Sequence, residues 1–368
     1  MPICQSLRRS AEYVYRDPAR NGARRRRTRR GLPALEGPRV REDDPLLSVS
    51  DLRMHFPVRE GLLLRTARFN RAVDGVSFDI APGETLGLVG ESGCGKSTLG
   101  RCIARLYRPT AGNVTFAGTD ITHLRGRALM PYRRDIQMIF QDPMESLNAR
   151  HTVGDILEEP LIVQKVGTRA ERAARVRDLL DIVGLPARSA SRYPFEFSGG
   201  QRQRIGIARA IALNPRLVIC DEPVSALDVS IQSQILNLLV DLQREFGLAY
   251  LFIAHDLAVV KHISDRIAIM YLGRIVETAD SEDVYAHPEH PYTQSLISAI
   301  PIPDPHRRAE RIVLAGDVPS PIDPPSGCAF HPRCPRVMDT CKRVRPALAQ
   351  SDQGHEVACH LGAEEPGS

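Results

Sequence analysis

Short apolar runs and longer amphipathic segments alternate over much of this chain. Three short runs have the length and composition of buried strands, namely 85–89, 217–220 and the run that ends at Ala254. Two longer segments, 169–183 and 201–213, instead repeat apolar side chains at the spacing of one helix face. Strands that alternate with helices, above all in 213–280, predict an α/β fold with a parallel sheet.

The segment 169–183 shows the helical pattern most clearly. Good helix formers fill it, and its apolar positions are Ala173, Val176, Leu179, Leu180 and Val183. Gly184 follows directly and offers a C-cap. We therefore expect a helix here that buries its apolar face.

Composition divides the chain into three parts. Residues 1–46 form a basic tail, 47–280 form a body of strands and helices, and 281–368 form a C-terminal extension. Within the body, about 143–212 reads as mainly helical. Nine prolines lie between 288 and 325, so we expect extended, irregular backbone in the extension.

The charge of the chain is unevenly distributed. Its 368 residues carry a formal net charge of +5. Residues 1–46 hold twelve arginines and six acidic residues, a net +6, which leaves about −1 for the rest. A nearly neutral body argues against a nucleic-acid-binding enzyme with a basic face. The arginine run at 24–30 is typical of a solvated, disordered segment. Contact with anionic lipid or RNA, or an over-long assigned start, are the alternatives.

The sequence also bears on membrane insertion. It has no uncharged apolar run of about 18 residues, so we expect no transmembrane helix. The N-terminus lacks the apolar h-region of a signal peptide. We therefore expect a cytosolic chain, or one that a partner holds at a membrane.

The most specific motif follows the first apolar run. Residues 90–98 read Gly-Glu-Ser-Gly-Cys-Gly-Lys-Ser-Thr, which fits the phosphate-binding pattern G-x-x-x-x-G-K-[ST]. Its glycines let backbone N–H groups turn towards phosphate oxygens, and the helix that follows presents its positive end to the same anion. Lys96 would reach the β- and γ-phosphates, and Ser97 would ligate Mg²⁺. The predicted ATP-binding residues are Gly90, Ser92, Gly93, Cys94, Gly95, Lys96, Ser97 and Thr98.

Two further motifs add carboxylates and a second anion site. The apolar run 217–220 ends in Asp221 and Glu222. Asp221 suits an indirect contact with Mg²⁺, through one of the ligands of the ion or through a water. Glu222 can polarise a water for attack on the γ-phosphate. Ser-Gly-Gly-Gln at 198–201 opens an amphipathic segment, so it predicts a capped helix N-terminus that binds an anion.

These motifs together resemble those of the ATP-binding cassette (ABC) ATPases. The resemblance implies a P-loop nucleoside triphosphatase with a RecA-like core, an antiparallel β subdomain and a helical subdomain. It also implies that the signature residues contact the γ-phosphate of ATP held by the opposite subunit; they are Ser198, Gly199, Gly200 and Gln201. Because the chain has one phosphate-binding loop and one signature, two cassettes must face each other.

The resemblance assigns four more positions. Gln141 would contact Mg²⁺ and the attacking water, and His255 would contact the γ-phosphate. Asp228 would lie in a loop that crosses the dimer interface. Phe56 would stack on adenine, although Phe69 is nearby and an aromatic residue here also suits the core.

The extension narrows the resemblance. Residues 287–301, together with 56–64, 141–150 and 193–198, are similar to the peptide/nickel importer ATPases, and more closely to the second, F-type subunit of oligopeptide and dipeptide importers. This implies work at the cytoplasmic face of the cell membrane with two permease subunits and an extracytoplasmic solute-binding protein. A second ABC ATPase subunit would complete a heterodimer, with a homodimer as the alternative. Import of nickel, glutathione or another small solute is the rival function, and a soluble non-transport ABC ATPase is a more distant one.

Four of the eight cysteines gather in the extension, at Cys328, Cys334, Cys341 and Cys359. Structural disulfides are not expected in a cytosolic chain, and four thiols within 32 residues of proline-rich sequence suggest a metal that staples the segment. Four thiolates suit Zn²⁺ or an iron–sulfur cluster. The resemblance favours a 4Fe-4S cluster. The alternatives are unliganded thiols, or Zn²⁺ with spare ligands at His331, His355 and His360.

Overall fold

The computed structural model describes residues 44–60, 65–142, 146–300 and 311–361. The arginine run at 24–30 and nearly all of the predicted basic tail lie outside these residues. Among the described residues, no helix is long and apolar enough to cross a membrane.

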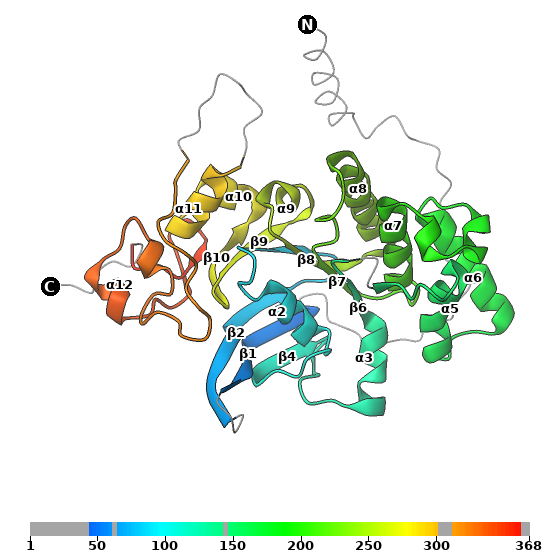
Figure 1. The fold of residues 1–368 in the computed structure, drawn as a ribbon, viewed down its shortest axis with the longest axis horizontal. Helices are drawn as coiled ribbons and strands as arrows, with labels where there is room; N and C mark the ends of the chain where they lie inside the picture. The colour runs from blue at the N-terminus through cyan, green and yellow to red at the C-terminus, as the bar shows by residue number, and fades with distance from the viewer. Residues whose placement is uncertain (1–43, 61–64, 143–145, 301–310, 362–368) are drawn as a thin grey trace, which may run out of the picture. The chain divides into compact units, whose positions relative to one another are not determined.

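The main sheet has eight strands in the order β11-β12-β10-β9-β3-β8-β7-β6 (Figure 1). The five strands from β9 to β6 pair in parallel. The bounds are β3 Thr85–Val89, β6 Ile136–Ile139, β7 Leu217–Asp221, β8 Ala249–Ala254, β9 Arg266–Tyr271, β10 Arg274–Asp280, β11 Ala349–Gln350 and β12 Glu356–Val357. The three strands predicted from apolar runs are thus confirmed as β3, β7 and β8.

The expectation of a wholly parallel sheet in 213–280 is wrong for β10. This strand pairs antiparallel with β9. Only Leu272 and Gly273 separate the two strands, with φ of 44° and 79°. A two-residue turn with positive φ returns the chain beside the strand it left, so the pair must be antiparallel.

A second, antiparallel sheet has the order β2-β1-β4-β5. Its bounds are β1 Leu47–Glu60, β2 Arg65–Ile80, β4 Ala111–Phe116 and β5 Thr119–Asp120. Helix α2 (Lys96–Ile103) lies against β1 and β2 as well as against β7 and β8 of the main sheet. The antiparallel β subdomain that the resemblance implies is therefore confirmed as a separate sheet.

Two apolar cores cover the two faces of the main sheet. Strand β8 shows the division, because its alternate side chains enter different cores. Tyr250 and Phe252 join the core that contains the helices, whereas Leu251 and Ile253 join the core shared with α2 and the antiparallel sheet. Figure 1 shows this layering, with α8 and α9 on one face and β1, β2 and β4 on the other.

The described part of the segment predicted to be mainly helical contains α-helices that contact one another. The helices are α5 Val153–Val163, α6 Arg169–Ile182 and α7 Gly199–Ala210, with short 3-10 turns η3 Ala187–Ser191 and η4 Pro194–Glu196 between them. The predicted helix at 169–183 is confirmed as α6, and its residues Val176, Leu179 and Leu180 are buried. Ala173 is exposed, contrary to expectation, because it precedes the turns of α6 that contact the core.

The remaining helices link strands or lie in the extension. Their bounds are η2 Gly126–Ala128, α3 Met130–Asp135, α8 Val229–Phe246, α9 Leu257–Ile263, α10 Ser281–Ala286, α11 Pro291–Ser298, η5 His331–Arg333 and α12 Asp339–Arg343. The extension is thus less irregular than its prolines predict. Pro291 stands at the first position of α11, where its missing N–H costs no hydrogen bond. Strand β12 also pairs with β10, so the extension enlarges the main sheet.

Candidate nucleotide site

The predicted phosphate-binding loop connects β3 to α2 and has no room for side chains at two glycines. A Cβ at Gly90 would lie 2.1 Å from the Met270 carbonyl oxygen, and one at Gly95 would lie 1.9 Å from that of Ala72. Gly95 also has φ of 107°. Both positions therefore require glycine, and the backbone runs tightly around the start of α2.

Lys96 lies inside this loop, although its charge would normally be solvated. Its side chain is 4% exposed, and the ammonium donates to the carbonyl oxygens of Gly90 at 2.7 Å and Glu91 at 3.0 Å. The Cys94 sulfur is 3.8 Å from the same nitrogen. A buried positive charge that is held only by neutral groups favours an anion in the loop.

Asp221 meets the loop from the end of β7. Its Oδ1 accepts a hydrogen bond of 2.7 Å from the Ser97 hydroxyl. Its Oδ2 is buried and has no hydrogen-bond partner among the described residues, and the closest positive charge, on Arg101, is 4.0 Å away. Burial raises the pKa of Asp221, while the hydrogen bond from Ser97 lowers it. An unpaired carboxylate oxygen beside a serine hydroxyl fits the oxygen ligands of Mg²⁺.

Glu222 gathers two polar side chains from neighbouring strand ends. Its Oε2 accepts a hydrogen bond of 3.1 Å from the Gln141 amide and lies 3.3 Å from the Nδ1 atom of His255. Gln141 follows β6, Glu222 follows β7 and His255 follows β8. Parallel strands bring their carboxyl ends to one edge of the sheet, so three residues far apart in sequence meet.

The backbone of Glu222 is in an unusual conformation. Its φ is 46°, in the left-handed region, which costs a residue with a side chain roughly 1–2 kcal/mol. Its N–H donates to the carbonyl oxygen of Ile253 at 3.0 Å. Strained positions of this kind cluster at functional sites.

The predicted signature opens α7. Ser198 is the N-cap, and its hydroxyl and the Gln201 side chain bond reciprocally to each other's backbone N–H groups at 3.4 and 3.1 Å. The first N–H groups of a helix have no intrahelical partner, so those of Gly199 and Gly200 remain available to an anion. A Cβ at Gly200 would lie 2.5 Å from Ile231, which brings the start of α7 against α8.

No hydrogen bond joins 90–98 to 198–201 among the described residues. Ser198 and Asp228 are both exposed, and Asp228 is the N-cap of α8. The signature is thus exposed and is not hydrogen-bonded to the phosphate-binding loop in the described part of the chain.

Phe56 lies on β1 and is half-buried. Its ring contacts the edge of Tyr107, with 5.7 Å between the ring centroids. The Arg101 guanidinium lies 5.9 Å from the Tyr107 ring centroid. Phe69 is 48% exposed, so the structure gives neither aromatic residue a fully buried core position.

Comparison with known proteins identifies the family. The ABC transporter family matches residues 73–225, and the oligopeptide/dipeptide transporter C-terminal region matches 276–341. A Brucella ovis protein named as a peptide import ATP-binding protein is 55% identical over 317 residues, or 86% of this chain and 98% of the relative. The oligopeptide transport ATP-binding protein AppF of Bacillus subtilis is 53% identical over 321 residues, with 86% and 98% coverage.

This chain belongs to the ATP-binding subunits of ABC transporters. Solved cassettes agree with this assignment. The dimeric structure of the ATP-binding cassette MJ0796 bound to ADP and Pi covers 64% of this chain and 98% of its own, at 30% identity and a TM-score of 0.57. CbiO1 of Clostridium perfringens covers 67% and 92%, at 27% identity and the same TM-score. The subunit is thus an ATP-hydrolysing cassette, and the predicted fold class is confirmed.

Two residues of this ABC subunit that contact its phosphate-binding loop, and a third that packs against one of them, were not predicted from the sequence. Tyr292 of α11 accepts a hydrogen bond of 3.0 Å from the Glu91 N–H. Arg333 of η5 donates to the Glu91 carboxylate at 2.8 and 3.2 Å. Phe330 packs against Tyr292 and is 1% exposed. No short motif joins these positions to residue 91, so only the fold reveals them.

The four cysteines of the extension lie near one another. The Cys328 N–H donates to the Cys341 carbonyl oxygen at 2.8 Å. Burial is the main cause that raises the pKa of Cys328 to about 11; the thiols of Cys341, Cys359 and Cys334 contribute to the rise, and a hydrogen bond from the Phe330 N–H opposes it. Within the part of the chain that the structure describes, no group of three or more His, Cys, Asp or Glu residues is placed to hold a metal ion.

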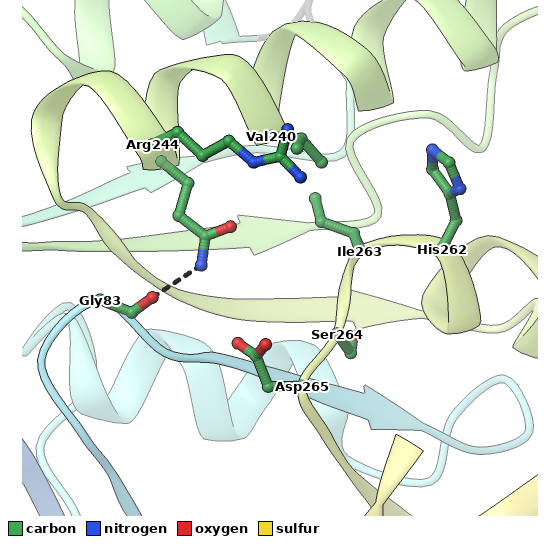
Figure 2. A pocket seen from close by; sticks show the side chains of 8 residues that line it. Gly83, Val240, Arg244, His262, Ile263, Ser264 and Asp265 are labelled. Carbon is green, nitrogen blue, oxygen red and sulfur yellow. Dashed lines mark hydrogen bonds between the residues drawn. The ribbon is translucent and has the colours of Figure 1, made fainter. Parts of the chain in front are cut away.

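Figure 2 shows a polar hollow of about 390 Å³ that is not the nucleotide site. It lies between the end of α8, the end of α9 and Gly83, and Gln243 crosses it to donate to the Gly83 carbonyl oxygen at 2.7 Å. Gly83 precedes β3, whereas the phosphate-binding loop follows it. The hollow is therefore at the amino end of that strand, away from Lys96 and Glu222.

Proposed function

We propose that this ABC subunit hydrolyses ATP to energise the import of oligopeptides or dipeptides. The observation that carries the proposal is the extension, which matches the C-terminal region of oligopeptide/dipeptide transporters and packs against the phosphate-binding loop of the same chain. The names of the relatives support peptides as cargo. The domain boundaries that we propose are a tail at 1–46, a cassette at 47–280 with its helical subdomain at about 143–212, and the extension at 281–368.

The residues of the strand ends would share the work of hydrolysis. Lys96 and the loop N–H groups would hold the phosphates, and Glu222 would accept a proton from the attacking water. Gln141 would orient that water, and His255 would contact the γ-phosphate. The hydrogen bond from Gln141 to Glu222 and the 3.3 Å approach of His255 support a common role for the three side chains.

Magnesium would bind beside Ser97. The Oδ2 of Asp221, which has no hydrogen-bond partner among the described residues, and the Ser97 hydroxyl are the oxygen groups that suit it, and Gln141 is the further ligand that the resemblance implies. The ion would neutralise charge on the phosphate oxygens. Asp221 in turn fixes the Ser97 side chain through their hydrogen bond of 2.7 Å.

ATP would be bound between two cassettes. The absence of a hydrogen bond between the signature and the phosphate-binding loop among the described residues, the exposure of Ser198 and Asp228, and the dimeric structure of MJ0796 support this arrangement. A second ABC ATPase subunit would face this one in a heterodimer, or a second copy in a homodimer. Phe56 would stack on the adenine of the nucleotide.

Two permease subunits would hold the cassettes at the cytoplasmic face of the membrane, and a solute-binding protein would deliver the peptide.

A hollow of about 360 Å³ offers a surface on which a permease would dock. Met138 and Phe140 line it from the core, and Pro160 and Val163 line it from α5. Val163 is 59% exposed, so an apolar partner surface would cover it. Phe140 lines the hollow and directly precedes Gln141, so a partner that binds here could move the Gln141 side chain.

Purification of the chain with its neighbours from detergent-solubilised membranes tests the proposed function. We expect two permeases and a second ATPase to accompany it, and peptide with its binding protein to stimulate ATP hydrolysis. Nickel and glutathione serve as matched cargo controls. Stimulation by one of these and not by peptides would assign the rival cargo, and ATPase activity without any membrane partner would favour a non-transport ATPase.

We further propose that Cys328, Cys334, Cys341 and Cys359 hold a 4Fe-4S cluster, with Zn²⁺ as the alternative. The chemistry of the donors supports this, because the four thiols are close enough for their charges to raise the pKa of Cys328, Cys334 and Cys359. The backbone N–H groups of Phe330, Arg336 and Leu361 lower the pKa of Cys328, Cys334 and Cys359, although burial raises each pKa more. Hydrogen bonds to sulfur are typical of iron–sulfur sites. A metal would have to draw the thiols closer together.

Anaerobic purification tests the cluster. We expect brown protein with iron and sulfide in about equal amounts, and loss of both when any of the four cysteines is changed to serine. Cys102→Ser and Cys220→Ser are the controls, since both thiols are buried in the cassette. Colourless protein with one zinc per chain would replace the cluster by Zn²⁺, and metal-free protein with an ordered extension would refute both.

A further inference from the structure

The phosphate-binding loop of this subunit contains a carboxylate that its motif does not require. Glu91 occupies a variable position of the pattern G-x-x-x-x-G-K-[ST], directly after Gly90. A negative charge in a phosphate-binding loop would repel the phosphates of ATP. The loop therefore needs a counter-charge, and neither Lys96 nor any other residue of 90–98 pairs with the Glu91 side chain among the described residues.

The counter-charge comes from the extension. Arg333 donates two hydrogen bonds to the two carboxylate oxygens of Glu91, at 2.8 and 3.2 Å, across 242 residues of sequence. The side chains are 9% exposed for Arg333 and 28% exposed for Glu91. This two-pronged geometry fixes the direction of the carboxylate as well as its charge, which a lysine would not do.

Every polar group of Glu91 is occupied. Its N–H donates to the Tyr292 hydroxyl at 3.0 Å, and its carbonyl oxygen accepts from the Lys96 ammonium at 3.0 Å and from the Cys94 N–H at 3.3 Å. The carboxylate is held by Arg333. The residue therefore connects the lysine that would bind phosphate with two side chains of the extension.

Those two side chains are themselves fixed by the fold. Tyr292 is 0% exposed, and Phe330 packs against both Tyr292 and Tyr271, with ring centroids 5.4 and 5.2 Å apart. Tyr271 ends β9 of the main sheet. The backbone N–H of Arg333 donates to the Phe330 carbonyl oxygen at 3.0 Å, which ties the backbone of residue 333 to this aromatic cluster. The support is thus rigid and buried rather than a chance surface ion pair.

We propose that Arg333 and Tyr292 are positioning residues for ATP, through which the extension sets the affinity of the phosphate-binding loop. Arg333 neutralises and orients the Glu91 carboxylate, and Tyr292 fixes the backbone of residue 91. The loop is then held in shape, with Lys96 in place, before nucleotide arrives. The extension becomes part of the nucleotide site, in addition to any role in the assembly of the transporter.

Nucleotide binding by the full-length chain tests this, with a fluorescent, non-hydrolysable ATP analogue and Mg²⁺ as the probe. We expect Arg333→Gln to raise the Kd roughly tenfold, because it leaves the Glu91 charge uncompensated beside the phosphates. The Kd of Arg333→Lys should lie between that of wild type and that of Arg333→Gln. Tyr292→Phe should raise the Kd a few-fold without any change of charge. Arg343→Gln, in the exposed part of α12, is the matched control and should bind like wild type.

The double variant separates positioning from simple loss of folding. Glu91→Gln together with Arg333→Gln removes the repulsion as well as its counter-charge, so its Kd should return to within about threefold of wild type. If Arg333 instead only packs against the fold, the double variant should bind ATP no better than Arg333→Gln, and both variants should have a lowered Tm. That result, or a Kd for Arg333→Gln within twofold of wild type, would overturn the proposal.

Discussion

Glu222→Gln should bind ATP with wild-type affinity and hydrolyse it about 10²–10⁴ times more slowly. Glutamine keeps the shape of the side chain, and its carbonyl oxygen can still accept the hydrogen bond that Gln141 donates at 3.1 Å. It has no carboxylate to take a proton from water. The phosphate grip of Lys96 and the Ser97–Asp221 contact lie elsewhere in the site and remain intact.

Two measurements on the same preparation check this expectation. Single-turnover hydrolysis gives the chemical step, and gel filtration with ATP shows whether cassettes accumulate as closed dimers. Glu245→Gln, an exposed carboxylate on α8, should behave as wild type in both. Turnover by Glu222→Gln within a few-fold of wild type would show that Glu222 does not accept the proton from water. His255, the other titratable side chain of the cluster, would then be the candidate for that role.

The sequence predicted the strand ends of the site well because parallel α/β sheets obey a simple rule. Apolar runs located β3, β7 and β8, and the residues that follow such strands meet at one edge. The meeting of Gln141, Glu222 and His255 follows from that rule. The left-handed backbone of Glu222 does not follow from it, because a glutamate at this position does not predict a positive φ.

The structure of the extension could not be predicted from local sequence patterns. Its prolines predicted irregular backbone, yet Pro291 begins a helix and β12 joins the main sheet. The contact between Arg333 and Glu91 depends on how a segment after residue 320 folds back onto the first third of the chain. No periodicity or spacing encodes such a contact, and an arginine between two cysteines looks like an ordinary solvated charge.

Ser198→Arg should abolish ATP hydrolysis by the assembled transporter while each cassette still binds ATP. Ser198 is exposed at the N-terminus of α7, and no hydrogen bond among the described residues links the signature to the chain's own phosphate-binding loop. Arginine places a bulky side chain at the entrance of an anion site and removes the N-cap hydroxyl, which costs α7 about 1 kcal/mol. Nucleotide binding at Lys96 is not touched by this change.

The readout is hydrolysis in the assembled complex together with nucleotide binding by the single chain. Ser191→Arg provides the matched control, since Ser191 is an exposed serine at the end of η3 in the same helical segment and carries no proposed ligand contact. In a homodimer, a mixed complex that holds Ser198→Arg on one cassette and Lys96→Ala on the other tells the two sites apart. If the signature acts on the opposite subunit's ATP, both changes affect the same composite site, and the second site of the dimer remains complete. Hydrolysis at wild-type rate by Ser198→Arg on both cassettes would show that the signature does not act across the dimer.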